Sequence, residues 1–163
     1  MLRSNTMMLG YLKNVQGTQD ALKNGWYGTR DLGVRDPDGD IRIKDRAVDA
    51  IFNCECEGLG DAISTLEIEV VLASHPAVEA AAVVGRPDDR LGERPCAFVK
   101  LKEGCTTSSQ DIIGFCGVKL PNYYYTVPGN VVFGDLPVNS TGKVHKFVLK
   151  EQAKELGKKK SVG

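Results

Sequence analysis

The sequence predicts an α+β fold, in which a small mixed β-sheet is flanked by helices and preceded by a β-hairpin. Three patterns support this expectation. Alternating apolar and polar residues on either side of the turn Asp36-Pro37-Asp38-Gly39 predict the hairpin. An apolar run at residues 77–85 and an alternating run at residues 96–102 predict two paired strands. Serines suited to helix N-caps precede two further segments, near residues 64 and 108.

The N-terminal part is expected to contain one short helix followed by the hairpin. Thr18 is a candidate N-cap for this helix, and Gly25 is a candidate stop. The hairpin strands are expected at residues 25–35 and 40–44. The proline of the turn presets its backbone, and the glycine can adopt a positive φ.

The central part is expected to alternate between helices and strands. The capping box Ser64-Thr65-Leu66-Glu67 predicts the start of a helix that ends before Pro76. Residues 86–89 are expected to turn the chain between the two paired strands, and residues 90–95 to form a loop.

A second helix, a short strand and a closing helix are expected to complete the chain. Ser108 or Ser109 caps the second helix, whose apolar residues share one face. The strand is expected at residues 130–133. The closing helix is expected from Val144 to Leu156, with Gly157 as its C-cap.

The composition excludes several classes of protein. The 21 basic and 21 acidic residues cancel, so no net charge would attract nucleic acid. The five cysteines have no spacing typical of a disulfide framework, and Cys54 and Cys56 with His75 do not match a zinc site, so we expect reduced thiols and no metal centre. No run of about 18 apolar residues predicts a membrane span, and cytoplasmic location is the default.

The segment from Leu136 to Leu149 contains the strongest candidate for chemistry. Lys143 directly follows Ser140-Thr141-Gly142, so it is expected at the tip of a tight turn in which the glycine adopts a positive φ. An ammonium group on a rigid base can neutralise phosphate or carboxylate oxygens as negative charge develops on them. A lysine in such a turn can equally be a surface residue that only keeps the chain soluble.

This segment resembles the C-terminal catalytic-lysine motif of the adenylate-forming enzymes, which include the plant-type acyl-activating enzymes and other acyl-CoA and aryl-CoA ligases. The stretch Gly25-Trp26-Tyr27-Gly28-Thr29-Arg30-Asp31-Leu32 resembles a second motif of this family. The resemblance implies that Lys143 contacts the substrate carboxylate and the ATP phosphates. It also implies that Asp31 binds the ribose hydroxyls and that Arg46 lies at the nucleotide edge of a hinge. A carboxylate can accept both hydrogen bonds of a diol.

The resemblance also implies a division of the chain into domains. Residues 1–43 correspond to the end of the large AMP-binding domain, and residues 49–163 to the small C-terminal domain. Residues 44–48 correspond to the hinge between them. Within the hinge, Asp45 precedes the nucleotide-edge arginine, and Val48 stands where the small domain swings.

A family member of this kind is an acid–CoA ligase. It activates a fatty or aryl carboxylic acid with ATP to an acyl-adenylate and transfers the acyl group to CoA. ATP with Mg²⁺ and CoA would be substrates, and no tightly bound cofactor is expected in this chain. The expected partner is the large N-terminal domain, without which the chain would lack full activity. A peroxisomal location would fit the family, although the chain ends without a Ser-Lys-Leu signal.

Departures from the family pattern leave a second interpretation open, that of a folded, non-catalytic remnant or interaction domain from a truncated gene product. Arg30 stands where the family has glycine, and Val48 where it has Asp or Lys. Gly129 stands where the family has Lys or Arg. The loop from Asn53 to Ala62 is longer than its family counterpart, which helps to form the pantetheine tunnel.

Overall fold

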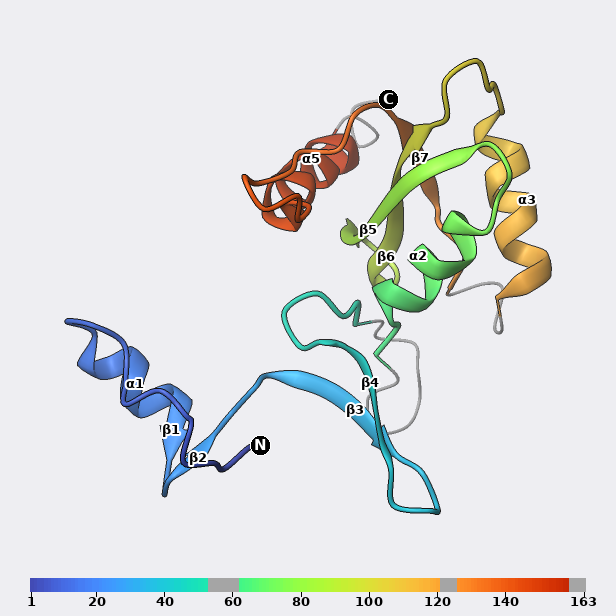
Figure 1. Cartoon of the computed structure of the whole chain (residues 1–163). Helices are drawn as coiled ribbons and strands as arrows, with labels where there is room; N and C mark the ends of the chain where they lie inside the picture. The colour runs from blue at the N-terminus through green and yellow to red at the C-terminus, as the bar shows by residue number, and fades with distance from the viewer. Residues whose placement is uncertain (53–61, 121–125, 159–163) are drawn as a thin grey trace. The chain divides into compact units, whose positions relative to one another are not determined.

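The computed structural model describes residues 1–52, 62–120 and 126–158 (Figure 1). The chain divides into two compact units, Met1–Val48 and Asp49–Gly163. The first unit contains helix α1 and strands β1 to β4, and the second contains helices α2, α3 and α5 and strands β5 to β7.

The first unit begins with a helix that starts earlier than predicted. Helix α1 spans Val15–Ala21, and Asn14 is its N-cap, accepting a hydrogen bond from the Gly17 N–H at 2.8 Å. The prediction that Thr18 caps the helix is wrong. Thr18 lies inside the helix, where its hydroxyl donates to the Asn14 carbonyl at 2.8 Å, a back-bond available to threonine within a helix.

Gly25 belongs to a tight hairpin and does not end the helix as predicted. Strands β1 (Leu22–Lys23) and β2 (Trp26–Tyr27) pair antiparallel around Asn24 and Gly25. Both turn residues have positive φ, 51° and 75°, which is the backbone that an Asn-Gly pair favours in a two-residue hairpin. The strand predicted over residues 25–35 is therefore divided in two.

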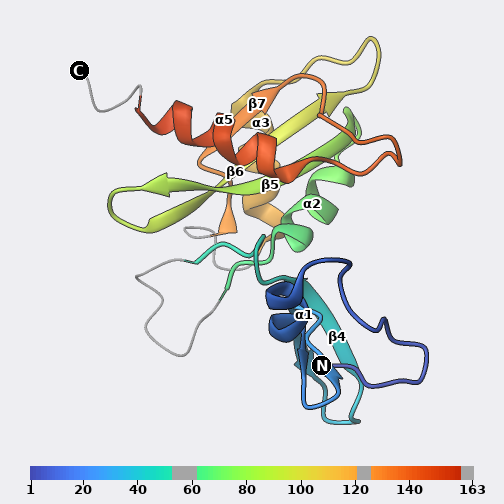
Figure 2. The ribbon, with the colours of Figure 1, turned by 90° about the vertical axis from the view of Figure 1, so that its left-hand side faces the viewer.

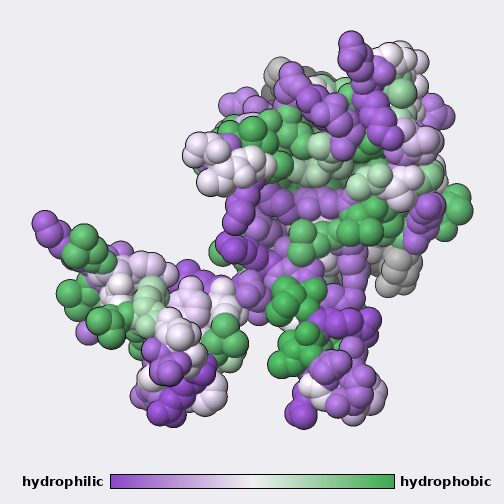
Figure 3. Space-filling model, viewed as in Figure 1, coloured by the Kyte–Doolittle hydropathy of each residue, from purple (hydrophilic) through white to green (hydrophobic). Residues whose placement is uncertain are grey.

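The predicted hairpin around the Asp-Pro-Asp-Gly turn is confirmed. Strand β3 (Asp31–Arg35) pairs antiparallel with β4 (Ile41–Arg46), and Gly39 turns with a φ of 97°. Its N–H donates to the Asp36 carbonyl at 2.9 Å. Most side chains on both strands remain exposed, and Figure 3 shows apolar residues among the polar ones on the surface of this unit.

A three-stranded mixed sheet forms the centre of the second unit, as predicted. Strand β5 (Val78–Asp88) pairs antiparallel with β6 (Gly92–Leu101), and β6 pairs parallel with β7 (Asn130–Phe133). The predicted turn at residues 86–89 is too early. Cross-strand pairing continues to Asp88 and Gly92, so the chain turns between these residues, and residues 92–95 form strand and not loop.

The two capped helices are confirmed. Helix α2 (Thr65–Ala73) follows the N-cap Ser64, whose hydroxyl accepts from the Glu67 N–H at 3.2 Å. Helix α3 (Ser109–Lys119) has Ser108 as its N-cap, in a reciprocal capping box with Asp111. Of the two serines considered for this cap, the first is the one used.

The closing helix, α5, spans Lys146–Lys158, so it starts two residues later than predicted, and Gly157 lies inside it and is not the C-cap. Val144 pairs instead with Val138 in an isolated antiparallel bridge. The bridge places the residues before α5 in a closed loop, and the helix begins after it.

Two apolar layers enclose the sheet of the second unit. Helices α2 and α3 cover one face, and α5 lies along the other (Figures 1 and 2). Residues alternate between the two layers along each strand, as the side-chain period of a β-strand requires. The layer under α2 and α3 includes Val83, Ala97 and Val99, and the layer under α5 includes Ala82, Val84, Cys96 and Phe98.

The predicted long loop from Asn53 to Ala62 lies outside the described residues, apart from Ala62 itself. The cysteines Cys54 and Cys56 lie there too. The chain is paired where it flanks this segment, because Ile51 and Ile63 exchange backbone hydrogen bonds of 3.1 and 2.9 Å.

Candidate functional site

Lys143 lies in a tight loop that is closed by the Val138–Val144 bridge. The Asn139 N–H donates to the Lys143 carbonyl, and the Gly142 N–H donates to the Asn139 carbonyl, each at 2.9 Å. Gly142 has a φ of 81°, and a Cβ added there would meet no atom within 4 Å. The glycine is therefore required by its backbone conformation and not by lack of space.

The side chain of Asn139 organises this loop. Its Oδ1 accepts hydrogen bonds from the Thr141 N–H at 2.9 Å, the Thr141 hydroxyl at 2.7 Å and the Lys143 N–H at 2.9 Å. Such bonds from an asparagine to the residues that follow it stabilise a turn. The sequence reasoning assigned no role to Asn139. Its position at the start of Asn-Ser-Thr-Gly was the signal that could have identified it.

The Lys143 side chain is exposed on this ordered loop. Within the part of the chain that the structure describes, its ammonium makes no hydrogen bond and no ion pair. The backbone N–H of Lys143 is fixed by Asn139, so the side chain extends from a hydrogen-bonded base. This arrangement can bring a mobile positive charge to an oxyanion that approaches from outside.

Asp31 and Arg46 lie opposite each other at one end of the β3–β4 hairpin, in the first unit. Asp31 is the first residue of β3, Arg46 is the last of β4, and the two are paired across the strands. Both are exposed. The hairpin thus brings together two residues 15 positions apart, counted from 31 to 46, that the sequence analysis assigned to nucleotide binding.

Arg30 has a φ of 59°, in the left-handed region that glycine favours. Its carbonyl accepts from the Ala47 N–H at 2.9 Å, just beyond the paired strands. The resembling family motif has glycine at this position. This chain therefore has a left-handed backbone at a residue with a long cationic side chain.

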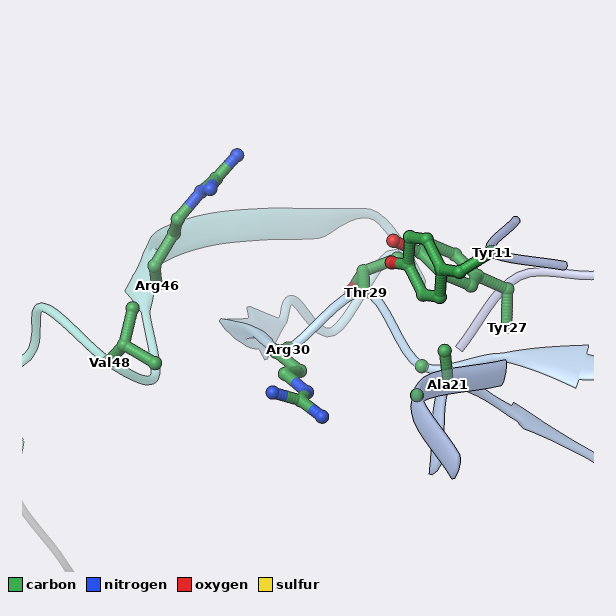
Figure 4. Close-up of a pocket in the computed structure, with 9 residues that line it drawn as sticks. Tyr11, Ala21, Tyr27, Thr29, Arg30, Arg46 and Val48 are labelled. Carbon is green, nitrogen blue, oxygen red and sulfur yellow. The ribbon is translucent and has the colours of Figure 1, made fainter. Parts of the chain in front are cut away.

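A hollow of about 410 Å³ lies in the first unit beside these residues (Figure 4). The rings of Tyr11 and Tyr27 lie side by side at one end of it. A hydrogen bond with Tyr11 raises the pKa of the Tyr27 phenol. The sequence reasoning did not identify the two tyrosines as neighbours. The hollow is lined by Tyr11, Gly17, Ala21, Tyr27, Gly28, Thr29, Arg30, Arg46 and Val48.

The two predicted hinge residues differ in burial. Asp45 is only 3% exposed, and its Oδ1 accepts from the Arg46 N–H at 2.7 Å. Val48 is 61% exposed and is the last residue of the first unit. Their role as a hinge stays a prediction.

The backbone of Gly129 lies close to the side chain of Arg94. A Cβ at this position would lie 2.8 Å from Nε of Arg94, in β6. A cation is therefore present beside position 129, although the residue itself has no side chain.

Neither a metal cluster nor a membrane helix is found in the described ranges. No three His, Cys, Asp or Glu side chains there are grouped so that they could hold a metal ion. None of the helices in those ranges combines the length and the apolar character needed to cross a membrane.

The chain is similar in sequence to members of a known protein family. Residues 67–143 match the AMP-binding enzyme C-terminal domain. The chain is 50% identical over 157 residues to the probable acyl-activating enzyme 21 of Arabidopsis thaliana. It is 47% identical over 162 residues to an acetate–CoA ligase of Humulus lupulus. Each alignment covers 96% of this chain, which spans 28% of the first relative and 27% of the second.

Two solved structures are similar to this chain. The anthranilate–CoA ligase in complex with anthranoyl-AMP superposes with a TM-score of 0.81 at 31% identity, covering 95% of this chain and 30% of that one. The o-succinylbenzoate–CoA synthetase of Bacillus subtilis superposes with a TM-score of 0.79 at 30% identity, covering 91% and 29%.

Proposed function

Because this chain belongs to the adenylate-forming enzymes and carries their C-terminal domain, we propose that it acts as the C-terminal part of an acid–CoA ligase. In the proposed reaction, ATP and a fatty or aryl carboxylic acid give an acyl-adenylate and pyrophosphate. CoA then displaces AMP to give the thioester. The partner in this reaction is the large domain of such an enzyme, which supplies the acyl pocket.

Lys143 is the proposed catalytic residue. The observation that carries this proposal is an exposed ammonium, without a partner among the residues that the structure describes, on a loop held by three hydrogen bonds to Asn139. In the adenylation step, Lys143 would bind the substrate carboxylate and the α-phosphate while negative charge develops between them. This is a positioning and electrostatic task, to which a preorganised cation contributes strongly.

Asp31 and Arg46 are the proposed nucleotide-binding residues. Asp31 would accept hydrogen bonds from the two ribose hydroxyls, and Arg46 would lie at the edge of the nucleotide. Their cross-strand pairing supports a common site, because it brings both side chains to one end of the hairpin. Rotation at Asp45 and Val48 would then withdraw Lys143 before CoA reacts.

The Mg²⁺ that accompanies ATP in such enzymes usually binds one or two carboxylates and the substrate phosphates. No acidic cluster that could hold the ion is found among the residues that the structure describes.

Adenylation in trans tests the proposal. The chain is mixed with the large domain of a similar ligase, ATP and a panel of carboxylic acids, and pyrophosphate release is measured. We expect release that Lys143→Ala abolishes and Lys154→Ala leaves intact. Lys154 is a matched control because it is an exposed lysine of α5 that pairs with Glu151 at the surface. Equal release by both variants would remove Lys143 from the mechanism.

A non-catalytic role is the second candidate function. It is favoured by Arg30, whose bulky side chain belongs to the lining of the hollow beside the proposed ribose site. Arg30→Gly distinguishes the two candidates in the same assay. If the folded chain releases no pyrophosphate with any large domain, and Arg30→Gly does not restore release, the non-catalytic role is supported.

A further inference from the structure

Lys146, the first residue of α5, is bound to two groups on α2. Its ammonium nitrogen donates to the Thr65 hydroxyl at 2.8 Å and lies 2.8 Å from Oε1 of Glu69. Thr65 is fully buried, and the side chains of Lys146 and Glu69 are only 18% and 19% exposed. Thr65 and Glu69 lie one helical turn apart and so share a face of α2. Charged hydrogen bonds in such a shielded place are stronger than surface ion pairs.

Glu69 extends this network to the sheet. The same carboxylate oxygen accepts a hydrogen bond of 2.8 Å from the backbone N–H of Val83. Val83 lies in β5, the outer strand of the order β5-β6-β7, so Glu69 satisfies an amide on the edge of the sheet. One carboxylate therefore joins α2, β5 and the start of α5.

Lys146 directly follows the base of the Lys143 loop. The His145 N–H donates to the Pro137 carbonyl at 2.8 Å, which closes the base of the loop. The Lys146 N–H donates to the Val144 carbonyl at 3.1 Å. An anchor at Lys146 thus holds the end of the loop against α2 and β5, three residues after Lys143.

Lys143 and Lys146 differ in whether their ammonium groups are paired with a carboxylate. The charge of Lys146 is matched by Glu69 at hydrogen-bond distance. Lys143 makes no such pair within the described ranges. An anion that reaches this loop therefore meets the ammonium of Lys143, whose backbone is held by the loop.

We infer that Lys146 is a positioning residue for Lys143 and acts through its contacts with Glu69 and Thr65. The inference rests on the proposed function, because the position of Lys143 matters for catalysis only if Lys143 binds the reacting groups. A misplacement of about 1 Å can lower a reaction rate by about a hundredfold. Loss of the anchor is therefore expected to affect the rate of adenylation more than the binding of ATP.

Amide hydrogen exchange in the full chain tests directly whether Lys146 holds the Lys143 loop in place. Lys146→Met keeps most of the side-chain length and removes the charge. We expect the protection of the Gly142 and Lys143 amides to fall about tenfold, with the amides of β5 and β6 unchanged. Lys154→Met, the control on the same helix, is expected to change neither set. If the loop and the sheet lose protection by the same factor, Lys146 is merely structural and the inference is overturned.

Kinetics in the reconstituted enzyme test the catalytic part. We expect Lys146→Met to lower kcat for pyrophosphate release by about ten- to a hundredfold, with KM for ATP within about twofold. Lys146→Arg keeps a charged donor and is expected to retain most of the rate. An unchanged kcat in Lys146→Met would overturn the inference. If the unaltered protein itself releases no pyrophosphate, the proposed function fails, and hydrogen exchange still decides whether Lys146 positions the loop.

Discussion

Replacing Arg30 by glycine is expected to stabilise the first unit, although most substitutions destabilise a protein. The left-handed backbone at Arg30, with its φ of 59°, costs a residue with a side chain about 1–2 kcal/mol. Glycine removes this cost, but its greater freedom in the unfolded chain destabilises the folded state by about 0.5–1 kcal/mol. The net expectation is a stabilisation of about 0.5–1 kcal/mol, the difference of these two terms.

Exchange of the Ala47 amide reports this change locally, because this N–H donates to the Arg30 carbonyl at 2.9 Å. A stabilisation of about 0.5–1 kcal/mol corresponds to protection about two- to fivefold higher. Arg35→Gly is the matched control, since Arg35 is an exposed arginine of the same hairpin without a positive φ. It is expected to lower protection, because glycine weakens a strand. Equal losses in both variants would refute the reasoning about Arg30.

Two further predictions concern titratable groups in the second unit. Burial raises the pKa of Cys96 and of Cys116 to about 11, whereas Cys105 is exposed. Site-resolved alkylation of the folded chain near pH 8 should therefore modify Cys105 before Cys96 and Cys116, and rapid modification of either buried thiol would contradict this. Hydrogen bonds from the Ser108 side chain and backbone hold the pKa of Asp111 below its ordinary value of 3.8. The contribution of Asp111 to stability is therefore complete above pH 3.8 and is lost as the pH falls through the lowered pKa. In Asp111→Asn, the free energy of unfolding measured with urea should fall less steeply as the pH is lowered through this range. An unchanged dependence on pH would exclude this role.

Local signals in the sequence were sufficient for most elements. Ser64 and Ser108 mark two helix starts because an N-cap satisfies amide groups of its own first turn, which lie within a few residues. The Asp-Pro-Asp-Gly turn fixes the β3–β4 hairpin for the same reason, since proline and glycine act on their own backbone. The α+β class with its mixed sheet followed from these signals.

Competition between local signals caused the errors. Asn14 and Thr18 can both cap a helix, and only the folded chain shows that Thr18 bonds back to Asn14 from inside α1. Asn24 and Gly25 provide a hairpin turn as readily as a helix stop. The end of β5 was placed too early because Pro87 suggests a turn, whereas pairing with β6 carries the strand past it.

The sequence by itself identified the family, the Lys143 loop and the residues that we propose bind the nucleotide. The tertiary structure decided what fixes them in place. Lys146 and Thr65 are 81 residues apart, and their contact depends on the packing of both α2 and α5 against β5. The left-handed backbone of Arg30 likewise depends on the bond from Ala47 across the hairpin. Residue type and spacing specify local geometry, but contacts between distant segments form only where burial brings those segments together.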